Sequence, residues 1–199
     1  MTVTVRPDPF TLIAYDAAEI AAIVREVAER VGLPAEVAIE VDVDEELFAP
    51  IVGHLSDVVD GVVKIWISGG NLEDSRKPRN FAPEQARRDF TFALLRAKDR
   101  LSPGFADAPD DAGLTRGERA AWDVSANGRA ERLGITVRRP AQRYDYLLQH
   151  GFTDVADAAF ERLWAADAIT WAELRAVCTE TGADERSASK IPVDILRRH

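Results

Sequence analysis

The sequence PEQARRDFTFALLRAKDRL, residues 83–101, predicts a long helix that opens with proline. Proline suits the first helical position, because the N–H that it lacks has no helical partner there. One apolar stripe recurs at helical spacing and comprises Ala86, Phe90, Ala93, Leu94, Ala97 and Leu101. Phe92 and Leu95 point to the opposite side, so the middle of the helix is apolar nearly all round. We therefore expect a central core helix that is covered on two sides.

The residues before this helix predict a small sheet. Residues 36–44 alternate strictly, which indicates a half-buried strand. One face carries Val37, Ile39, Val41 and Val43, and the other carries Glu36, Glu40, Asp42 and Asp44. Residues 2–6 and 62–68 predict two further strands, and residues 16–31 predict a helix. Asp16 is its expected N-cap and Gly32 its expected end. Residues 47–58 are ambiguous, with a short helix as one interpretation, and 71–82 are expected to form a polar loop.

The residues after the central helix predict further helices, at 115–133, 141–149, 154–166 and 170–182. Capping boxes start two of them, Thr115 with Glu118 and Thr170 with Glu173. The small residues Ala121, Ser125 and Gly128 form a face that another backbone could approach closely. The helix at 154–166 is expected to bury Val155, Ala159, Phe160, Leu163 and Trp164.

These elements predict an α+β fold that is dominated by helices, with a small N-terminal sheet packed on the central helix. Arg138-Arg139-Pro140 is interpreted as a hinge, which divides the chain into an α+β domain at 1–139 and a helical subdomain at 140–199. The last residues, 185–199, are polar except for four aliphatic side chains that we expect to dock as a small tail. These four are Ile191, Val193, Ile195 and Leu196.

Composition and charge bound the classes of function. The chain has 199 residues, 46% hydrophobic and 30% charged, as in a folded soluble protein. It has no apolar run near the roughly 20 residues of a membrane helix, and the N-terminus lacks a signal-peptide layout. One cysteine fits a reducing compartment, so a cytoplasmic location is expected. The net charge of −9 argues against general affinity for nucleic acids.

The search for catalytic and metal-binding groups leaves one acidic candidate. With three histidines and one cysteine, the chain has no zinc-binding spacing, and we expect no metal and no cofactor. Carboxylates on one strand face lie about 7 Å apart and could hold a hard cation or act as acid and base. Glu40, Asp42 and Asp44, with His54 as a fourth, are therefore the candidate residues of a carboxylate- or divalent-ion-dependent hydrolase. The alternative interpretation is a solvated strand face.

Arginines in the middle of the chain form a second candidate site. Residues 61–143 carry a net charge of +5, whereas residues 1–60 carry −10. The arginines that could converge on one anion-binding surface are Arg76, Arg79, Arg87, Arg88, Arg138, Arg139 and Arg143. Tyr144, Tyr146 and Trp122 could then stack on bases. The alternative is that these arginines pair with the protein's own acids, which the net charge favours.

The order helix, strand, strand, helix, helix across residues 16–134 resembles the minimal core of the zincin metallopeptidases. The resemblance implies that the helix at 83–101 takes the place of the metal-binding helix. Glu118 or Asp123 would lie on the helix that supplies the family's additional glutamate. The H-E-x-x-H motif is absent, so the resemblance implies a relative without metal or activity, and no active-site residue is carried over.

Well-formed caps and apolar stripes, without a cluster of reactive groups, favour a non-enzymatic interaction or structural module. Its expected partner is another protein or a second copy of the chain. The carboxylate hydrolase and the nucleic-acid binder stay open as alternatives.

Overall fold

The computed structural model describes residues 1–47, 55–74 and 76–183. The chain divides into two compact units, Met1–Leu101 and Ser102–His199, which we call the N-terminal and C-terminal units. The expected division was at 139/140. The units divide earlier because helix α3 (Arg116–Arg132) packs against the three helices that follow it. The helix-dominated α+β class is confirmed.

The N-terminal unit contains a four-stranded sheet in the order β1-β2-β4-β3. Its strands are β1 (Thr2–Arg6), β2 (Ala38–Asp44), β3 (Leu55–Val59) and β4 (Val62–Ser68). The first three in spatial order are parallel, and β3 pairs antiparallel with β4 at the edge. The predicted strands at 2–6, 36–44 and 62–68 are thus confirmed, the second beginning at Ala38.

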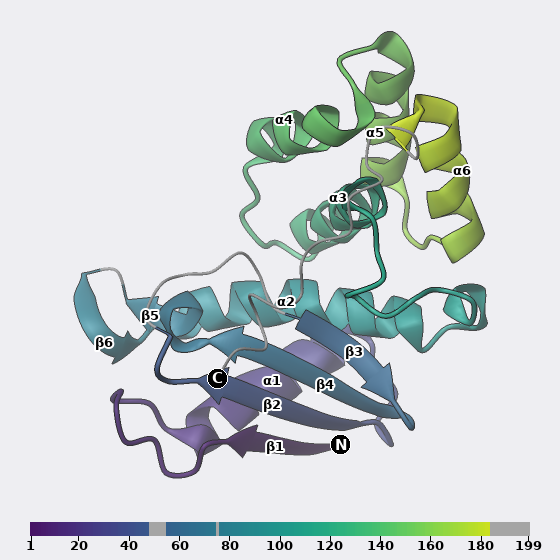
Figure 1. Cartoon of the computed structure of the whole chain (residues 1–199). Coiled ribbons are helices and arrows are strands. Elements are labelled where there is room, and N and C mark those ends of the chain that lie inside the picture. The colour runs from purple at the N-terminus through teal and green to yellow at the C-terminus, as the bar shows by residue number, and fades with distance from the viewer. Residues whose placement is uncertain (48–54, 75, 184–199) are drawn as a thin grey trace. The chain divides into compact units, whose positions relative to one another are not determined.

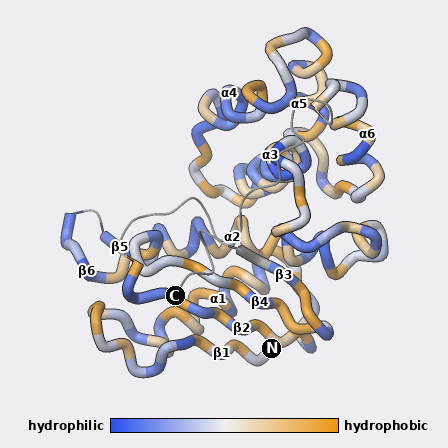
Figure 2. The backbone as a smooth tube through the Cα atoms, viewed as in Figure 1, coloured by the Kyte–Doolittle hydropathy of each residue, from blue (hydrophilic) through white to orange (hydrophobic). Residues whose placement is uncertain are grey.

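Two helices, α1 (Ala17–Val31) and α2 (Pro83–Arg100), lie side by side on one face of this sheet (Figure 1). The alternation of apolar and polar residues is visible along β2 and β4 as alternating colours in Figure 2. Ile39 and Val41 of β2 and Ile65 of β4 are buried on the helix side. As predicted, α2 is a core helix, with Ala86, Phe90, Ala93, Leu94, Leu95 and Ala97 all buried.

Local chemistry explains where these helices begin and end. The Asp16 carboxylate accepts hydrogen bonds from the N–H groups of Ala18 and Glu19, as an N-cap should. Gly32 ends α1 with φ 75°, a left-handed conformation that glycine adopts without steric cost. Lys98 Nζ of α2 donates to the Val31 carbonyl oxygen at 2.7 Å, which ties the end of α1 to α2.

Two segments differ from the sequence-based expectation. Within 47–58, the described residues from Leu55 onward form strand β3 and not a helix, because Asp60 and Gly61 make a hairpin turn to β4 with φ 52° and 77°. The expected loop at 71–82 contains a 3₁₀ turn (Gly69–Leu72) and the two-stranded ribbon of β5 (Glu73–Asp74) and β6 (Lys77–Phe81). The ribbon also has contacts from outside: the N–H of Ala14 donates to the carbonyl oxygen of Arg79 at 3.0 Å, and the ring centroids of Phe81 and Tyr15 lie 5.3 Å apart.

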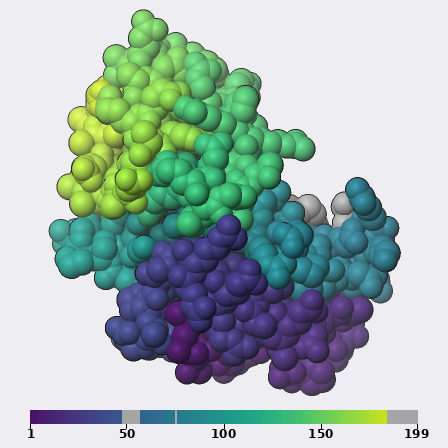
Figure 3. Space-filling view, turned by 180° about the vertical axis from the view of Figure 1, so that it is seen from behind, coloured from purple at the N-terminus to yellow at the C-terminus, as the bar shows by residue number. Residues whose placement is uncertain are grey.

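The C-terminal unit is a bundle of α3, α4 (Arg139–His150), α5 (Asp154–Ala165) and α6 (Trp171–Thr181). Both expected capping boxes are present, at Thr115 and Thr170. The buried centre is aromatic, with Trp122, Tyr146 and Phe160 among its largest side chains. The space-filling view in Figure 3 shows the green and yellow side chains of this unit packed into one continuous surface.

Helix α3 meets α5 at Gly128, where the two backbones approach closely. A Cβ built on Gly128 would lie 2.1 Å from the carbonyl oxygen of Trp164. Arg132, one turn further along α3, donates to the carbonyl oxygens of Trp164 and Ala166 and so caps the end of α5. The small-residue face that the sequence predicted is therefore an internal helix contact.

Two further expectations need correction. The proposed hinge at Arg138–Pro140 is the start of α4, because proline is accepted in the first turn of a helix. Val155 was expected to be buried but is 46% exposed. The buried stripe of α5 is centred on Ala156, Phe160 and Leu163, which turns Val155 outward at its edge. The four aliphatic residues of the expected tail lie outside the described residues.

The contact at Gly128 predicts that an alanine substitution there lowers the free energy of unfolding, whereas the same substitution inside a helix ordinarily raises it. Replacing an interior helical glycine with alanine ordinarily stabilises a helix by about 1 kcal/mol. Because the new methyl group would overlap the Trp164 carbonyl oxygen, we expect Gly128→Ala to destabilise the C-terminal unit by about 2 kcal/mol or more. Urea denaturation of the full chain, followed by tryptophan fluorescence and circular dichroism, measures the change.

A matched control is Gly61→Ala in the β3–β4 turn, where a Cβ meets nothing within 4 Å but φ is 77°. We expect a loss of about 1 kcal/mol there, from backbone strain alone. A Gly128→Ala variant that is as stable as the parent chain, or more so, would contradict the close α3–α5 approach.

Candidate functional site

The candidate acidic residues of β2 lie on the sheet face opposite to α1 and α2. Glu40 and Asp42 are exposed there, and Glu40 lies 3.9 Å from Lys64 of β4 in a half-exposed ion pair. Asp44 accepts a hydrogen bond from the N–H of Glu46, which shapes the turn after β2. His54 lies outside the described residues. The described part of the chain brings no three histidine, cysteine, aspartate or glutamate side chains together in a metal-binding group.

Glu45, at the end of the same acidic run, has a structural role. Its carboxylate accepts three hydrogen bonds, from the N–H and the hydroxyl of Thr11 and from the N–H of Leu12, each at 2.8 Å. Desolvation opposes the charged form, but these three bonds outweigh it and lower the pKa of the Glu45 carboxyl. Glu45 therefore anchors the segment that leads into α1.

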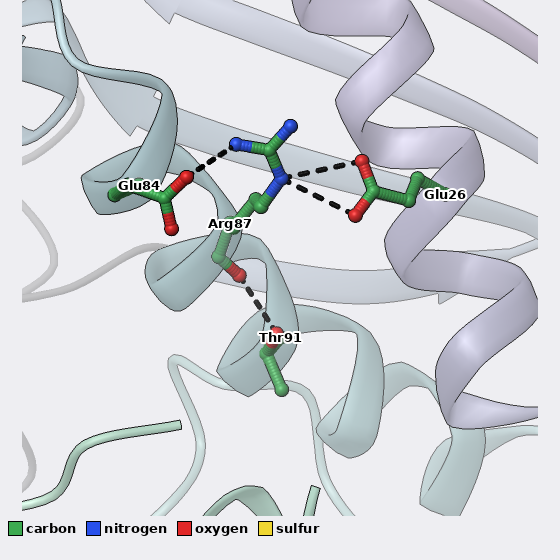
Figure 4. Close-up of polar contacts among 4 residues, drawn as sticks. All are labelled: Glu26, Glu84, Arg87 and Thr91. Carbon is green, nitrogen blue, oxygen red and sulfur yellow. Dashed lines mark hydrogen bonds and ion pairs between the residues drawn. The ribbon is translucent and has the colours of Figure 1, made fainter. Parts of the chain in front are cut away.

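The candidate arginines of the N-terminal unit are distributed over separate places. Arg87 donates through Nε to both carboxylate oxygens of Glu26 at 3.2 Å and through Nη1 to Glu84 at 2.8 Å (Figure 4). Arg88 pairs with Asp89, whose carboxyl has a raised pKa because it is buried, partly offset by Arg88 and Gln85. Arg76 and Arg79 are exposed on the β5–β6 ribbon.

Two of the three candidate arginines of the C-terminal unit form ion pairs with acids of the same unit. Arg139 pairs with Glu161 and lies over the rings of Phe160 and Trp164, 5.9 and 5.1 Å from their centroids. Arg143 lies 2.6 Å from Asp157, and Arg138 is the exposed N-cap residue of α4. Four of the seven candidate arginines thus pair with acids of the protein itself, which removes much of the positive charge that phosphate binding needs.

Buried polar groups in the C-terminal unit serve its packing. His150 is fully buried and stacked on Tyr146, with ring centroids 4.0 Å apart. Its Nδ1 lies 2.8 Å from the Thr181 hydroxyl and its Nε2 lies 2.9 Å from the Gly117 carbonyl oxygen. Cys178 is buried on α6. With both ring nitrogens engaged inside the core, His150 joins the ends of three helices and is inaccessible to a substrate.

The two acidic residues that the zincin resemblance pointed to, Glu118 and Asp123, also take part in contacts within the protein. Glu118 is buried, accepts from the N–H of Thr115 in the capping box and forms an ion pair with Arg175 of α6. Asp123 accepts through its backbone carbonyl oxygen from the side chain of Asn127. Glu118 is therefore occupied as a cap and as an ion-pair partner. The relationship to zincins stays a prediction.

Exposed apolar side chains gather at one place, the corner between α4 and α5. Six large apolar side chains are exposed among the described residues, and four of them lie between 144 and 155. The four, with exposed fractions in order, are Tyr144 at 57%, Leu148 at 53%, Phe152 at 64% and Val155 at 46%. We call this group the α4–α5 patch. Scattered single exposures are ordinary, whereas a contiguous apolar group indicates a binding surface.

The geometry of α4 explains how the patch forms. Tyr144 and Leu148 are four residues apart and share one face of the helix. At about 100° per residue, the centre of this face lies about 130° around the helix from the centre of the one that buries Tyr146 and Leu147. Phe152, just beyond the end of α4, folds back so that its ring centroid lies 5.9 Å from that of Tyr144. Helix α4 therefore carries large apolar side chains outside its buried stripe.

This patch was not predicted from the sequence, because Tyr144 was a candidate for base stacking and Val155 was expected in the core. The available signal was the pattern Tyr144, Tyr146, Leu147, Leu148, which places apolar residues on more than one side of a short helix.

No protein-family model, curated protein or solved structure matches the chain. No helix in the described part of the chain is long and apolar enough to cross a membrane.

The role of Glu45 predicts a pH-dependent difference in stability. A carboxyl whose pKa is lowered on folding stabilises the folded state above its unfolded pKa of about 4.3 and loses this effect as the pH falls through the lower, folded value. We therefore expect Glu45→Gln to have a lower free energy of unfolding than the parent chain at pH 7, and this difference to shrink as the pH falls below about 4.3. Urea denaturation at each pH measures it.

The control is Glu46→Gln, which removes one negative charge from the exposed neighbour of Glu45. If the free energy of unfolding of Glu45→Gln differs from that of the parent chain by the same amount at pH 7 and pH 3, the Glu45 carboxylate is not an anchor.

Proposed function

We propose that this protein is a non-enzymatic interaction module whose C-terminal unit binds a polypeptide segment through the α4–α5 patch. The observation that carries the proposal is the gathering of four of the six exposed large apolar side chains at one corner. The candidate carboxylates and arginines support it indirectly, because most of those described are engaged in ion pairs, caps and turns.

The patch has the composition of a protein-binding surface. Aromatic residues are enriched in the buried centres of interfaces, and Tyr144 and Phe152 supply two adjacent rings. Full burial of one large apolar side chain contributes about 1.5–3 kcal/mol, so four such side chains can support specific binding. Because three of the four lie on helices, the surface is formed before a partner arrives, which lowers the entropic cost of association.

The remaining expectations are compatible with this role. A reducing compartment such as the cytoplasm suits a chain whose one cysteine lies on α6 and is buried. A descent from zincin-like ancestors would leave a scaffold without a metal helix, free to serve as a binding module.

The proposal predicts that the patch selects aliphatic peptides. Random peptides displayed on phage are panned against the full chain and against the double variant Leu148→Ser with Phe152→Ser. We expect enriched peptides to contain leucine, isoleucine or valine. Their affinity for the double variant should fall about 100-fold, because two large contacts worth about 3 kcal/mol in sum are lost. Fluorescence anisotropy of the enriched peptides measures the affinities.

Leu12→Ser, a substitution of an exposed leucine in the N-terminal unit, is the matched control and should leave the affinities unchanged. The substituted positions are exposed, so circular dichroism should confirm unaltered folding. Peptides that bind the double variant as tightly as the parent chain would overturn the proposal.

A further inference from the structure

We infer that the α4–α5 patch binds a second copy of the chain, through the same patch on both copies and about a two-fold axis. The inference rests on the proposed function, since it requires that the exposed apolar side chains contact polypeptide. In this dimer, the exposed faces of two α4 helices pack against each other in antiparallel directions. A two-fold interface must be self-complementary, and the exposed face of α4 meets that condition.

The exposed face of α4 carries a row of side chains that fits its own copy. Ala141, Tyr144 and Leu148 are exposed, and their spacing of three and four residues places them on one face. With a two-fold axis midway between residues 141 and 144, the ring of Tyr144 in each copy lies over Ala141 of the other. The small side chain of Ala141 leaves room for the ring, and Leu148 extends the row at its end. Large side chains therefore face small ones, which lets the two helices interdigitate.

Two exposed charges on one edge of this face have no partner within a single copy. Arg138, at the start of α4, and Asp145 are seven residues apart, which is nearly two turns, so they lie on the same edge. Neither side chain forms an ion pair or a hydrogen bond with another residue in the described part of the chain. The neighbouring Arg139 and Arg143 both pair with acids of α5. Arg138 and Asp145 are thus the charges of α4 that remain available to a partner.

The two-fold axis brings these two charges together. It places the same edge of both helices side by side and reverses their directions, so Arg138 of each copy meets Asp145 of the other. Their positions differ by about 3 Å along the helix axis, which an arginine side chain spans. A parallel pair of helices would place these edges on opposite sides of the interface and leave the charges unpaired. The charges therefore favour the antiparallel dimer of identical chains.

The size of the patch sets the expected strength of the dimer. A buried aromatic side chain covers about 150–250 Å², so the exposed parts of two rings and two aliphatic side chains amount to roughly 300–400 Å² per copy. A standard interface buries about 800 Å² per partner, of which about 450 Å² is apolar. We therefore expect a reversible dimer with a dissociation constant of about 1–100 μM. At nanomolar concentration the chain is then monomeric, and the patch is free to bind a peptide.

Sedimentation equilibrium of the full chain between about 1 and 200 μM tests the inference. The single variants Arg138→Asp and Asp145→Arg each place like charges at both contacts, so we expect their dissociation constants to rise about tenfold. An equimolar mixture of the two variants pairs opposite charges again and should associate within about threefold of the parent chain.

The control is Arg25→Asp at an exposed position of α1, which makes the same change in charge and should leave the dissociation constant unchanged. Both substituted positions of α4 are exposed, and aspartate is a favoured N-cap residue at position 138, so circular dichroism should show unaltered folding.

A parent chain that is monomeric throughout this range rules out the second copy as the occupant. So do single variants that dimerise as tightly as the parent chain, or a mixture that associates no better than either variant alone. The displayed peptides test the proposed function separately, because both charge variants retain the four apolar side chains of the patch. Peptide binding by a chain that does not dimerise would leave the patch as a peptide-binding surface and remove only the second copy.

Discussion

The close contact between the backbones of α3 and α5 is the constraint on which the C-terminal unit depends. It exists because residue 128 is glycine, whose missing side chain lets the Trp164 carbonyl oxygen approach. Arg132 then satisfies the carbonyl oxygens of Trp164 and Ala166 at the end of α5. With α5 fixed in this way, α4 packs one apolar face on the bundle and leaves Tyr144 and Leu148 on the other. The exposed patch is thus a consequence of how the core is closed.

Charge in this protein is used mainly for structure. Arg87 bridges Glu26 of α1 and Glu84 of its own helix, and Glu118 is at once a cap and the partner of Arg175. Isolated surface pairs of this kind contribute little to stability, but they reduce the charge that is available for binding a substrate or a nucleic acid. The binding surface that we propose therefore lies among the exposed apolar side chains and not among the titratable groups.

The sequence predicted most of the elements and little of the candidate site. Caps and periodicity are local signals, so the helix at 83–101, the strand at 36–44 and the small-residue face at Gly128 were predicted correctly. The strand at Leu55–Val59 was not predicted, because its pairing with β4 is a tertiary interaction that a weak local pattern does not encode. The exposure of Val155 was not predicted for a related reason. Which side chains of α5 are buried depends on where α3 packs against it, and this is a tertiary interaction. A surface formed by the end of one helix and the start of the next has no periodic signature.

We propose that the α4–α5 patch binds an aliphatic polypeptide segment. The decisive measurement is of nuclear Overhauser effects between the ring protons of Tyr144 and Phe152 and the methyl groups of a peptide that has been enriched against the full chain. We expect such cross-peaks when the peptide is added to the protein. A bound peptide whose methyl groups show no contact with either ring would overturn the proposal.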